Sequence, residues 1–340
     1  MSILKTLTTG TLAVLAMAST LSAKDFSGAE LYTNEEYTYG KFEARMKMAA
    51  ASGTVSSMFL YQNGSEQASA QRWVEVDIEV LGKNPNSFQS NIITGKAGAQ
   101  VTSEKHHSVS PAADQGFHTY GLEWTPDYVS WTLDGKEVRR TKKGDNKNQV
   151  ENLIGTQGLR FNIWSSESAD WVGNFDESKL PLFQFINWVK VYKYTPGRGE
   201  NGSDFTLDWT DNFDSFDSGR WSKGNWTFDG NRVDLTPNNI YTRDGMLILA
   251  LTRKGQEYFN GQVPQDNEPA PVSSSSVTPP PESSSSSEPF IPPMSSSSEP
   301  ITAIQQVRTP QMQPKEVRGI VNAKGAHVKE INRYRVNFKY

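Results

Sequence analysis

The sequence predicts an all-β protein, an antiparallel β-sandwich in which one curved sheet presents a concave groove to solvent. Between Lys24 and Val263, apolar residues recur at every second position, and Gly, Asn and Asp separate the short runs. No segment of this region has the 3.6-residue period of a long amphipathic helix. Because cysteine is absent from the 340 residues, a hydrophobic core must stabilise the sandwich without disulfides.

The first clear strand covers residues 41–48. Its apolar positions alternate with charged positions, as expected when one face of a strand is buried and the other is solvated. The apolar set is Phe42, Ala44, Met46 and Met48, and the charged set is Lys41, Glu43, Arg45 and Lys47.

A second strand, at residues 74–80, carries a row of carboxylates. Valine and isoleucine occupy one face, which belongs in the core, and Glu75, Asp77 and Glu79 occupy the other. Like charges at this spacing raise one another's pKa, so one carboxyl group can stay protonated while its neighbour is ionised.

An acid beside a carboxylate is the pair that glycoside hydrolysis requires. The alternative interpretation is an ordinary strand whose acidic face is solvated. All nine tryptophans precede residue 230, and the C–H faces of sugar rings stack well on indole rings. The aromatic context therefore favours a carbohydrate site over a metal or nucleic-acid site, although several tryptophans must belong to the core.

Three later segments complete the predicted sandwich. Val129–Leu133 leads into Asp134-Gly135, a two-residue hairpin signal, and a return strand through Val138 follows. Ile186–Tyr192 and Met246–Leu251 alternate in the same way, the latter after a turn at Asp244-Gly245.

Charge and histidine spacing exclude several classes of site. The whole chain has a net charge of −4, and residues from Ile301 onward contribute +6, so residues 1–300 carry a net charge of −10. This negative charge disfavours binding of nucleic acid or anionic membrane by the main domain. The four histidines lack zinc-ligand spacing. We expect His118 to be a hydrogen-bonded core residue, and His106 and His107 to lie on a surface loop.

Composition divides the chain into four parts. Residues 1–23 have the pattern of a secretory signal peptide, with Lys5, the apolar stretch Leu12–Met17 and a small-residue exit at Ala23. The apolar stretch is too short to span a bilayer, so we expect a secreted protein, extracellular or periplasmic. Residues 24–264 form the predicted catalytic domain, and the Ser/Pro-rich residues 265–300 form a linker.

The fourth part is a basic tail, residues 301–340. Tyr334–Phe338 alternates like a single strand, and the positive charge suits contact with either acidic cell-surface polymers or the export machinery. The protein as a whole is expected to be a monomer.

Four blocks of the sequence resemble the glycoside hydrolases of family sixteen, in the form found in bacterial lichenases (endo-1,3-1,4-β-glucanases). The blocks are Tyr39–Lys47, Trp73–Gly82, Phe117–Trp124 and Asn162–Trp164. The resemblance covers about residues 25–260. It implies a concanavalin-like jelly roll that hydrolyses mixed-linkage β-glucan with retention of configuration and without a catalytic cofactor.

The blocks depart from the usual order of the family. Asp211–Trp221 and Asp244–Leu249 resemble the segment that normally precedes the block at Tyr39, but here they follow all the others. We therefore expect a circular permutation, which a sandwich tolerates when the original termini lie close together on the surface.

The resemblance implies roles for individual residues. Glu75 is the nucleophile and Glu79 the general acid/base, with Asp77 between them. A flat strand separates the Cα atoms of Glu75 and Glu79 by about 13 Å, whereas a retaining pair needs carboxyl groups about 5–5.5 Å apart, so sheet curvature must bring them together. The implied substrate-binding residues are Phe59, Tyr61, Asn63, Trp73, Gln89, Asn91, Glu104, Arg160, Asn162, Trp164 and Trp226.

A structural calcium ion is also implied by the resemblance. Its ligands correspond to Asn187 and the backbone oxygens of Asn212 and Gly245. Relatives often have aspartate where Asn187 stands, and because a neutral amide adds no charge, we expect weaker calcium binding.

Two alternatives remain open. One is a hydrolase of the same family acting on another polysaccharide, such as laminarin, xyloglucan or a galactan. Relatives acting on 1,3-linked glucans often have one extra residue, a bulge, in the carboxylate strand, and its absence here favours mixed-linkage glucan. The other is a non-catalytic glucan-binding lectin on the same sandwich, in which the two glutamates have no chemical role.

Overall fold

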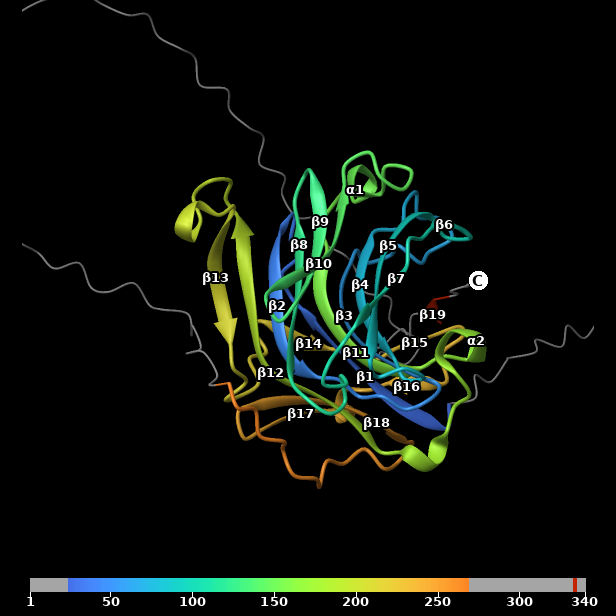
Figure 1. The fold of residues 1–340 in the computed structure, drawn as a ribbon. Coiled ribbons are helices and arrows are strands. Elements are labelled where there is room, and N and C mark those ends of the chain that lie inside the picture. Colours follow the sequence, from blue (N-terminus) through green and yellow to red (C-terminus); the bar gives the residue numbers. More distant parts are fainter. Residues whose placement is uncertain (1–23, 269–332, 335–340) are drawn as a thin grey trace, which may run out of the picture. The chain divides into compact units, whose positions relative to one another are not determined.

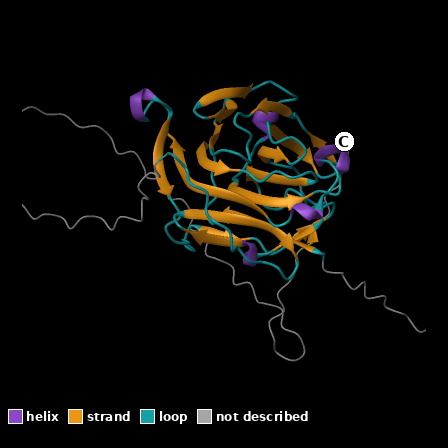
Figure 2. Ribbon diagram, turned by 60° about the horizontal axis from the view of Figure 1, so that its bottom comes forward, coloured by secondary structure: helices purple, strands orange, loops and turns teal. Residues whose placement is uncertain are grey.

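Two curved β-sheets pack face to face in the computed structural model, which describes residues 24–268 and 333–334 (Figure 1). Helices are few and short in this part of the chain (Figure 2). They are α1 (Gln149–Asn152), α2 (Ala169–Val172) and the 3₁₀ turns η1 (Glu177–Lys179), η2 (Glu200–Gly202) and η3 (Pro237–Asn239). The predicted all-β sandwich is confirmed. None of the described helices has the length and apolarity needed to cross a membrane.

One sheet, which we call the groove sheet, carries the carboxylate strand near its centre. Its strands follow the order β14, β1, β11, β3, β4, β5, β7, each antiparallel to its neighbour. Their bounds are β14 (Trp221–Lys223), β1 (Phe26–Thr33), β11 (Gly158–Ser165), β3 (Thr54–Tyr61), β4 (Glu75–Leu81), β5 (Ser87–Lys96) and β7 (Lys105–Ser108).

The second sheet, which we call the outer sheet, follows the order β10, β9, β8, β2, β12, β18, β17, and β13 pairs with the far half of β12. The bounds are β10 (Lys136–Lys142), β9 (Tyr128–Leu133), β8 (His118–Trp124), β2 (Gly40–Lys47), β12 (Leu182–Tyr194), β18 (Met246–Arg253), β17 (Ile240–Arg243) and β13 (Phe205–Asp211).

Strand β1 joins the two sheets. Its first residues pair with β18 and with β16 (Val233–Leu235), while the rest of the strand pairs with β11 and β14. The short β6 (Ala99–Val101) extends β5. A separate parallel pair joins β15 (Thr227–Phe228) to β19 (Arg333–Tyr334).

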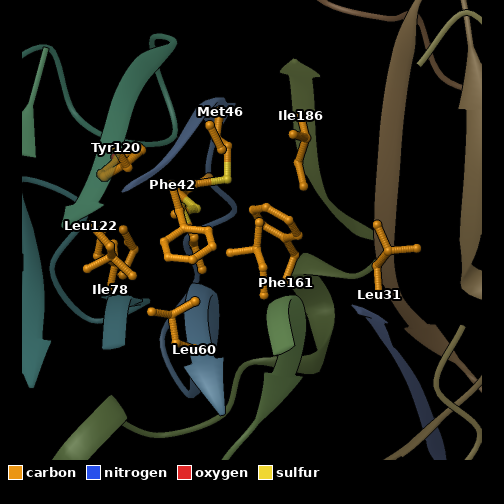
Figure 3. Close-up of a cluster of buried hydrophobic side chains, with 14 of the residues drawn as sticks. Leu31, Phe42, Met46, Leu60, Ile78, Tyr120, Leu122, Phe161 and Ile186 are labelled. Carbon is orange, nitrogen blue, oxygen red and sulfur yellow. The ribbon is translucent and has the colours of Figure 1, made fainter. Parts of the chain in front are cut away.

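The core lies between the sheets (Figure 3). Because side chains alternate along a strand, each strand sends every second residue inward. Leu60, Ile78 and Phe161 come from the groove sheet, and they meet Phe42 and Leu122 from the outer sheet. All five are fully buried, so packing of this interior holds the groove sheet rigid from behind.

The predicted turns and strands occur where expected, and the strands β10, β12 and β13 contain bulges. Asp134 and Gly135 both have positive φ, as a two-residue hairpin requires. The return strand β10 then shifts register between Glu137 and Arg139, and β12 shifts register between Ile186 and Trp188, so that Asn187 is the extra residue there. A bulge redirects the side chain beside it.

The domain extends beyond the boundary expected at residue 264. Asp266, placed in the linker by composition, accepts two hydrogen bonds of 2.9 Å from the Arg45 guanidinium. Arg45 was expected on a solvated face, but it is only 8% exposed because this segment covers it. Phe259, in the same segment, is buried against Phe185 and Ile248 of the outer sheet.

The histidine expectations are met in part. His118 is buried and hydrogen-bonded through Nδ1 to Asp134 and through Nε2 to the Pro111 carbonyl oxygen, as predicted. His106 and His107 do not lie on a loop. They belong to strand β7, where His107 is partly covered and contacts Phe88 and Ser90.

Several predictions fall outside the described residues. These are the signal peptide at residues 1–23, the linker beyond Glu268, and the tail except for Arg333–Tyr334. Of the strand predicted at residues 334–338, the structure describes only Tyr334, in β19.

Candidate active site

The carboxylates of β4 face a groove on the outside of the groove sheet. Glu75, Asp77 and Glu79 all line it, whereas the alternate residues of the strand are fully buried in the core. Strand β4 pairs with β3 and β5 without any register shift. The strand is therefore unbulged, as its sequence predicts.

Cross-strand pairing places the carboxylates in rows of side chains that run across the groove sheet. Directly opposite residues of neighbouring strands project from the same face of a sheet, so the register decides which side chains are neighbours. One row consists of Tyr32, Arg160, Phe59, Asp77 and Asn91, and the next consists of Glu30, Asn162, Ser57, Glu79 and Gln89. The first row combines rings with charges, and the second is entirely polar.

The groove has a volume of about 810 Å³. The structure brings together in it every substrate-binding residue that the sequence suggested: Phe59, Tyr61, Asn63, Trp73, Gln89, Asn91, Glu104, Arg160, Asn162, Trp164 and Trp226. These residues come from three strands, β3, β5 and β11, and from several loops. Several of their aromatic rings lie near one another, with ring centroids 6.2 Å apart for Tyr61 and Trp73 and 6.4 Å apart for Phe59 and Tyr61.

Glu75 sits at one end of the carboxylate row. Its Oε2 accepts a hydrogen bond from the indole Nε1 of Trp73. Burial raises the pKa of Glu75 to about 7, although the Trp73 hydrogen bond and the charge of Arg160 act in the opposite direction by favouring the ionised form. Of the two glutamates, Glu75 is therefore the one whose surroundings support a carboxylate.

Glu79 lies at the other end of the row, and among residues 24–268 no cation is found that offsets its burial. Burial raises the pKa of Glu79 to about 8, and the charges of Glu75 and Glu104 act in the same direction. Its Oε2 accepts a hydrogen bond of 3.3 Å from the Gln89 amide, whose oxygen in turn accepts one from Trp171. Glu79 therefore holds its proton to higher pH than Glu75 does.

Asp77 lies between the two glutamates and is 3% exposed. Burial raises the pKa of Asp77 well above its usual range, and the charges of Glu75 and Glu79 add to this effect. Asp77 and Glu75 share a side-chain hydrogen bond, in which a protonated Asp77 donates and Glu75 accepts. From the core side, the Trp131 indole nitrogen donates to the Asp77 backbone oxygen over 2.9 Å.

Arg160 fixes the end of the groove near Glu75. Its guanidinium forms an ion pair with Glu30, and both side chains are 5% exposed. The same group donates to the Asn63 side chain and lies 5.1 Å from the centre of the Tyr61 ring. One buried cation thus links strands β1 and β11 to the loop after β3.

Ten groove residues were missed by the sequence reasoning: Glu30, Ser57, Gly64, Glu66, Gln67, Ile93, Gln100, Thr102, Trp171 and Phe228. Glu30 carried a usable signal, because residues 26–33 alternate and place it on the face opposite Ala29 and Leu31. Glu66 stands in an irregular loop without such a pattern. It is 7% exposed, accepts the Tyr61 hydroxyl hydrogen bond, and its other oxygen has no protein partner in the described structure.

A second cavity, of about 240 Å³, contains the residues suggested for calcium. Asn187, Asn212 and Gly245 all line it, together with Asp214 and Asp266. The bulge in β12 directs Asn187 into this cavity, where its amide nitrogen donates to Asp266 over 2.8 Å. Oxygen donors of this kind fit a hard cation such as calcium. Among the described residues, no cluster of three or more His, Asp or Glu side chains could bind a metal, so a ligand set of three or more here must include amide or backbone oxygens.

Comparisons with known proteins agree with this geometry. The family model described as "Glycosyl hydrolases family 16" matches residues 5–190. The β-glucanase of Fibrobacter succinogenes is 72% identical over 355 aligned residues, which cover 100% of both chains. The β-glucanase of Brevibacillus brevis is 35% identical over 179 residues, covering 52% of this chain and 63% of its own.

A solved structure is similar over a shorter range. The prokaryotic β-1,3-1,4-glucanase (lichenase) derived from a mouse hindgut metagenome shares 28% identity and superimposes with a TM-score of 0.40. That alignment covers 48% of this chain and 77% of the lichenase.

Proposed function

Because this chain belongs to the glycosyl hydrolases of family 16, we propose that it is an endo-hydrolase of mixed-linkage 1,3-1,4-β-glucan. The observation that carries the proposal is the unbulged carboxylate strand, whose two glutamates differ in pKa and face an open groove. A groove open along the sheet suits a polysaccharide chain that is cut internally.

The reaction we propose is a double displacement. Glu75, supported as a carboxylate by Trp73 and Arg160, attacks the anomeric carbon and forms a glycosyl-enzyme ester. Glu79 gives its proton to the leaving glycosidic oxygen in the same step. Glu79 is then a carboxylate, and it removes a proton from the water that cleaves the ester and regenerates Glu75.

Asp77 supports both glutamates in this scheme. As a protonated acid it donates its hydrogen bond to Glu75, which orients the nucleophile. When Glu75 becomes an ester, its charge disappears and the pKa of Glu79 falls, because one of the charges that raised it is gone. The change prepares Glu79 to act as a base in the second step.

The groove rows supply two kinds of sugar contact. Phe59, Tyr61 and Trp226 offer faces on which sugar rings stack. Asn91 and Asn162 offer amide groups that exchange hydrogen bonds with sugar hydroxyls. The buried acceptor of Glu66 would accept a hydroxyl at the end of the groove near Glu75.

We also propose that the second cavity binds a structural calcium ion through Asn187, Asn212 and Gly245. An ideal Cβ placed on Gly245 would lie 4.0 Å from the Asn212 backbone oxygen and 3.8 Å from a carboxylate oxygen of Asp214. These oxygens therefore converge on one side of the cavity. The ion would tie the turn before β18 to the bulge in β12.

The proposed circular permutation is supported by the positions of the chain ends. Phe26 of β1 pairs with Arg253 of β18, so the first and last long strands of the domain are neighbours. The family match ends at residue 190, whereas β13 to β18 complete the same two sheets up to residue 253.

We further propose that the protein is exported and acts as a monomer on glucan outside the cytoplasm. The support is the composition of residues 1–23 and the insoluble or polymeric nature of the substrate. N-terminal sequencing of protein recovered from the producing cells should give Lys24 as the first residue. The tail is proposed to contact the cell surface or the export machinery through its positive charge.

Product analysis by NMR during hydrolysis of barley β-glucan tests the central proposal. A double displacement inverts the anomeric centre twice, so the β-anomer should form first and mutarotate afterwards. An α-anomer formed first would remove the nucleophile role from Glu75. A faster release of reducing sugar from laminarin than from lichenan would assign another substrate, and unchanged hydrolysis in both Glu75→Ala and Glu79→Ala would support the lectin alternative.

A further inference from the structure

Arg139 is a buried cation that the proposed chemistry does not use. It belongs to β10 at the edge of the outer sheet and is 5% exposed. Within residues 24–268, no carboxylate lies at ion-pair distance from its guanidinium, in contrast to the buried Arg160 with Glu30. A charge buried in this way is costly unless its field or its hydrogen bonds serve the surrounding structure.

The bulge in β10 is what turns Arg139 inward. In a regular hairpin after Asp134-Gly135, the residue opposite Trp131 would be Val138. The register shift places Arg139 there instead, and its guanidinium carbon lies 4.3 Å from the centre of the Trp131 ring. The backbone irregularity therefore exchanges an apolar side chain for a cation at this point of the interior.

The guanidinium reaches the underside of the groove sheet. Nη1 donates over 2.9 Å to both the backbone oxygen and the hydroxyl of Ser90, and Nη2 donates over 2.8 Å to the Ser103 hydroxyl. Nε donates to Thr141 over 3.3 Å. All of these acceptors are neutral, so the positive charge is not cancelled by its immediate partners.

The contacts with Ser90, Ser103 and Trp131 lead to the groove within one residue. Ser90 stands between Gln89 and Asn91 on β5 and faces the core while they face the groove. Ser103 precedes Glu104, and the Ser103 backbone N–H donates over 2.9 Å to the Asn91 side chain. Trp131, which Arg139 covers, donates to the Asp77 backbone oxygen.

The charged groups that act on Arg139 most strongly are the two acids Glu104 and Asp77. Burial lowers the pKa of Arg139 to about 10, and Glu104 and Asp77 act in the opposite direction. A cation at this position opposes the negative charge of the groove acids. His107, from β7, has its pKa lowered to about 4 by burial and by Arg139, Lys105 and His106, and it is neutral at the pH where the groove acids titrate.

We propose that Arg139 is a positioning residue for the hydrolytic reaction, holding the Ser103–Glu104 loop and the β5 backbone in place while its charge opposes the excess negative charge of the carboxylate row. The inference rests on the proposed function. It assigns to one side chain two separable effects, one from hydrogen-bond geometry and one from charge.

Two substitutions separate these effects. Arg139→Met removes both the charge and the hydrogen bonds. We expect kcat/KM for barley β-glucan to fall about tenfold. Both limbs of the pH profile of kcat/KM should also move to higher pH by roughly half a pH unit, because the carboxyl groups of the groove bind protons more tightly without the cation. Arg139→Lys keeps the charge but loses the forked contacts, so kcat/KM should fall while the limbs stay in place.

A third variant and a matched control complete the experiment. Ser103→Ala removes only the loop contact and leaves the cation buried, and it should raise KM about threefold without moving the limbs, since one hydrogen bond is lost. Arg140→Met changes the neighbouring arginine, which pairs with Glu137 and contacts Tyr128 at the surface. It should match the wild type.

If the pH profile of kcat/KM for Arg139→Met has its limbs at the same pH values as the wild type, the proposed effect of the Arg139 charge is wrong. If that variant does not fold, an unchanged KM in Ser103→Ala overturns the positioning assignment. Glu75→Ala, measured alongside, separates the two proposals: retained hydrolysis in that variant means that the proposed function fails, whatever Arg139 does.

Discussion

The indole nitrogen of Trp73 donates its hydrogen bond to Oε2 of Glu75, two residues further along the same chain. Trp73 is buried and lies two residues before the start of β4, and it lines the groove. A single aromatic side chain therefore both lines the groove and supplies the donor that favours the ionised form of Glu75.

Replacing Trp73 by phenylalanine should shift the acidic limb of the kcat/KM profile upward by about one pH unit. The hydrogen bond stabilises the carboxylate and so lowers the pKa of Glu75, and a hydrogen bond to a charged group contributes about 1.5–3 kcal/mol. The pH dependence of β-glucan hydrolysis gives the measurement. Trp124→Phe is the control, because the Trp124 nitrogen has no partner in the described structure and the residue lies in the core; an equal shift in both variants would contradict the explanation.

The end of the folded domain can be located by truncation. A chain ending after Glu268 keeps the Arg45–Asp266 pair, whereas a chain ending after Pro264 leaves the buried Arg45 without it. We expect the shorter chain to lose about 3 kcal/mol of unfolding free energy, at the low end of the range for removing one partner of a buried pair. Activity at 25 °C should be similar in both, because the groove lies on the other sheet. Equal stability of the two chains in urea would show that Asp266 contributes nothing.

The same pair should contribute to acid sensitivity. Asp266 has its pKa lowered by Arg45 and Asn187, although burial acts to raise it. The stability that ionised Asp266 contributes is therefore fully present at pH values above the ordinary carboxyl pKa of 3.8. It is lost as the pH falls through the lower pKa that Asp266 has in the folded protein. Asp266→Asn should be less stable than the wild type at pH 6, and the difference should shrink towards pH 2. Glu268→Gln, at the 60% exposed neighbour, should change stability by less than about 0.5 kcal/mol at either pH.

His118 should titrate above the ordinary histidine pKa of 6.5. Its hydrogen bond to Asp134 raises the pKa although burial opposes this. The charged pair therefore adds stability below pH 6.5, and the contribution disappears as the pH rises through the folded pKa. NMR titration of the ring protons should show a lower pKa in Asp134→Asn than in the wild type. An unchanged value would mean that the Pro111 carbonyl alone holds the ring.

Calcium binding should respond to the residue at position 187. Asn187→Asp adds a negative charge to the cavity and should increase the rise in Tm produced by calcium, whereas Asn187→Ala should abolish the rise. Differential scanning calorimetry with calcium and with EDTA gives the comparison. Magnesium serves as the ion control because it demands a tighter octahedral site. No calcium-dependent change in Tm in the wild type would withdraw the proposed site.

Alternation and turn chemistry determined much of this protein from sequence alone. A sequence period of two predicts the strands at residues 41–48, 74–80 and 186–192. It also predicts the common face of Glu75, Asp77 and Glu79, and turn chemistry predicts the hairpin at Asp134-Gly135. These features depend on residues close together in the chain, so local preference is sufficient to specify them.

Only the tertiary structure decided how those elements combine. Glu30 becomes a groove residue because β1 pairs with β11, and Arg139 becomes a core cation because β10 has a bulge. Asp266 belongs to the domain because it meets Arg45, which is more than two hundred residues away in the chain. The pKa difference between Glu75 and Glu79 likewise depends on Arg160 and Glu104, which come from other elements. Burial, charge and register between distant segments set these properties, and no local pattern in the sequence contains them.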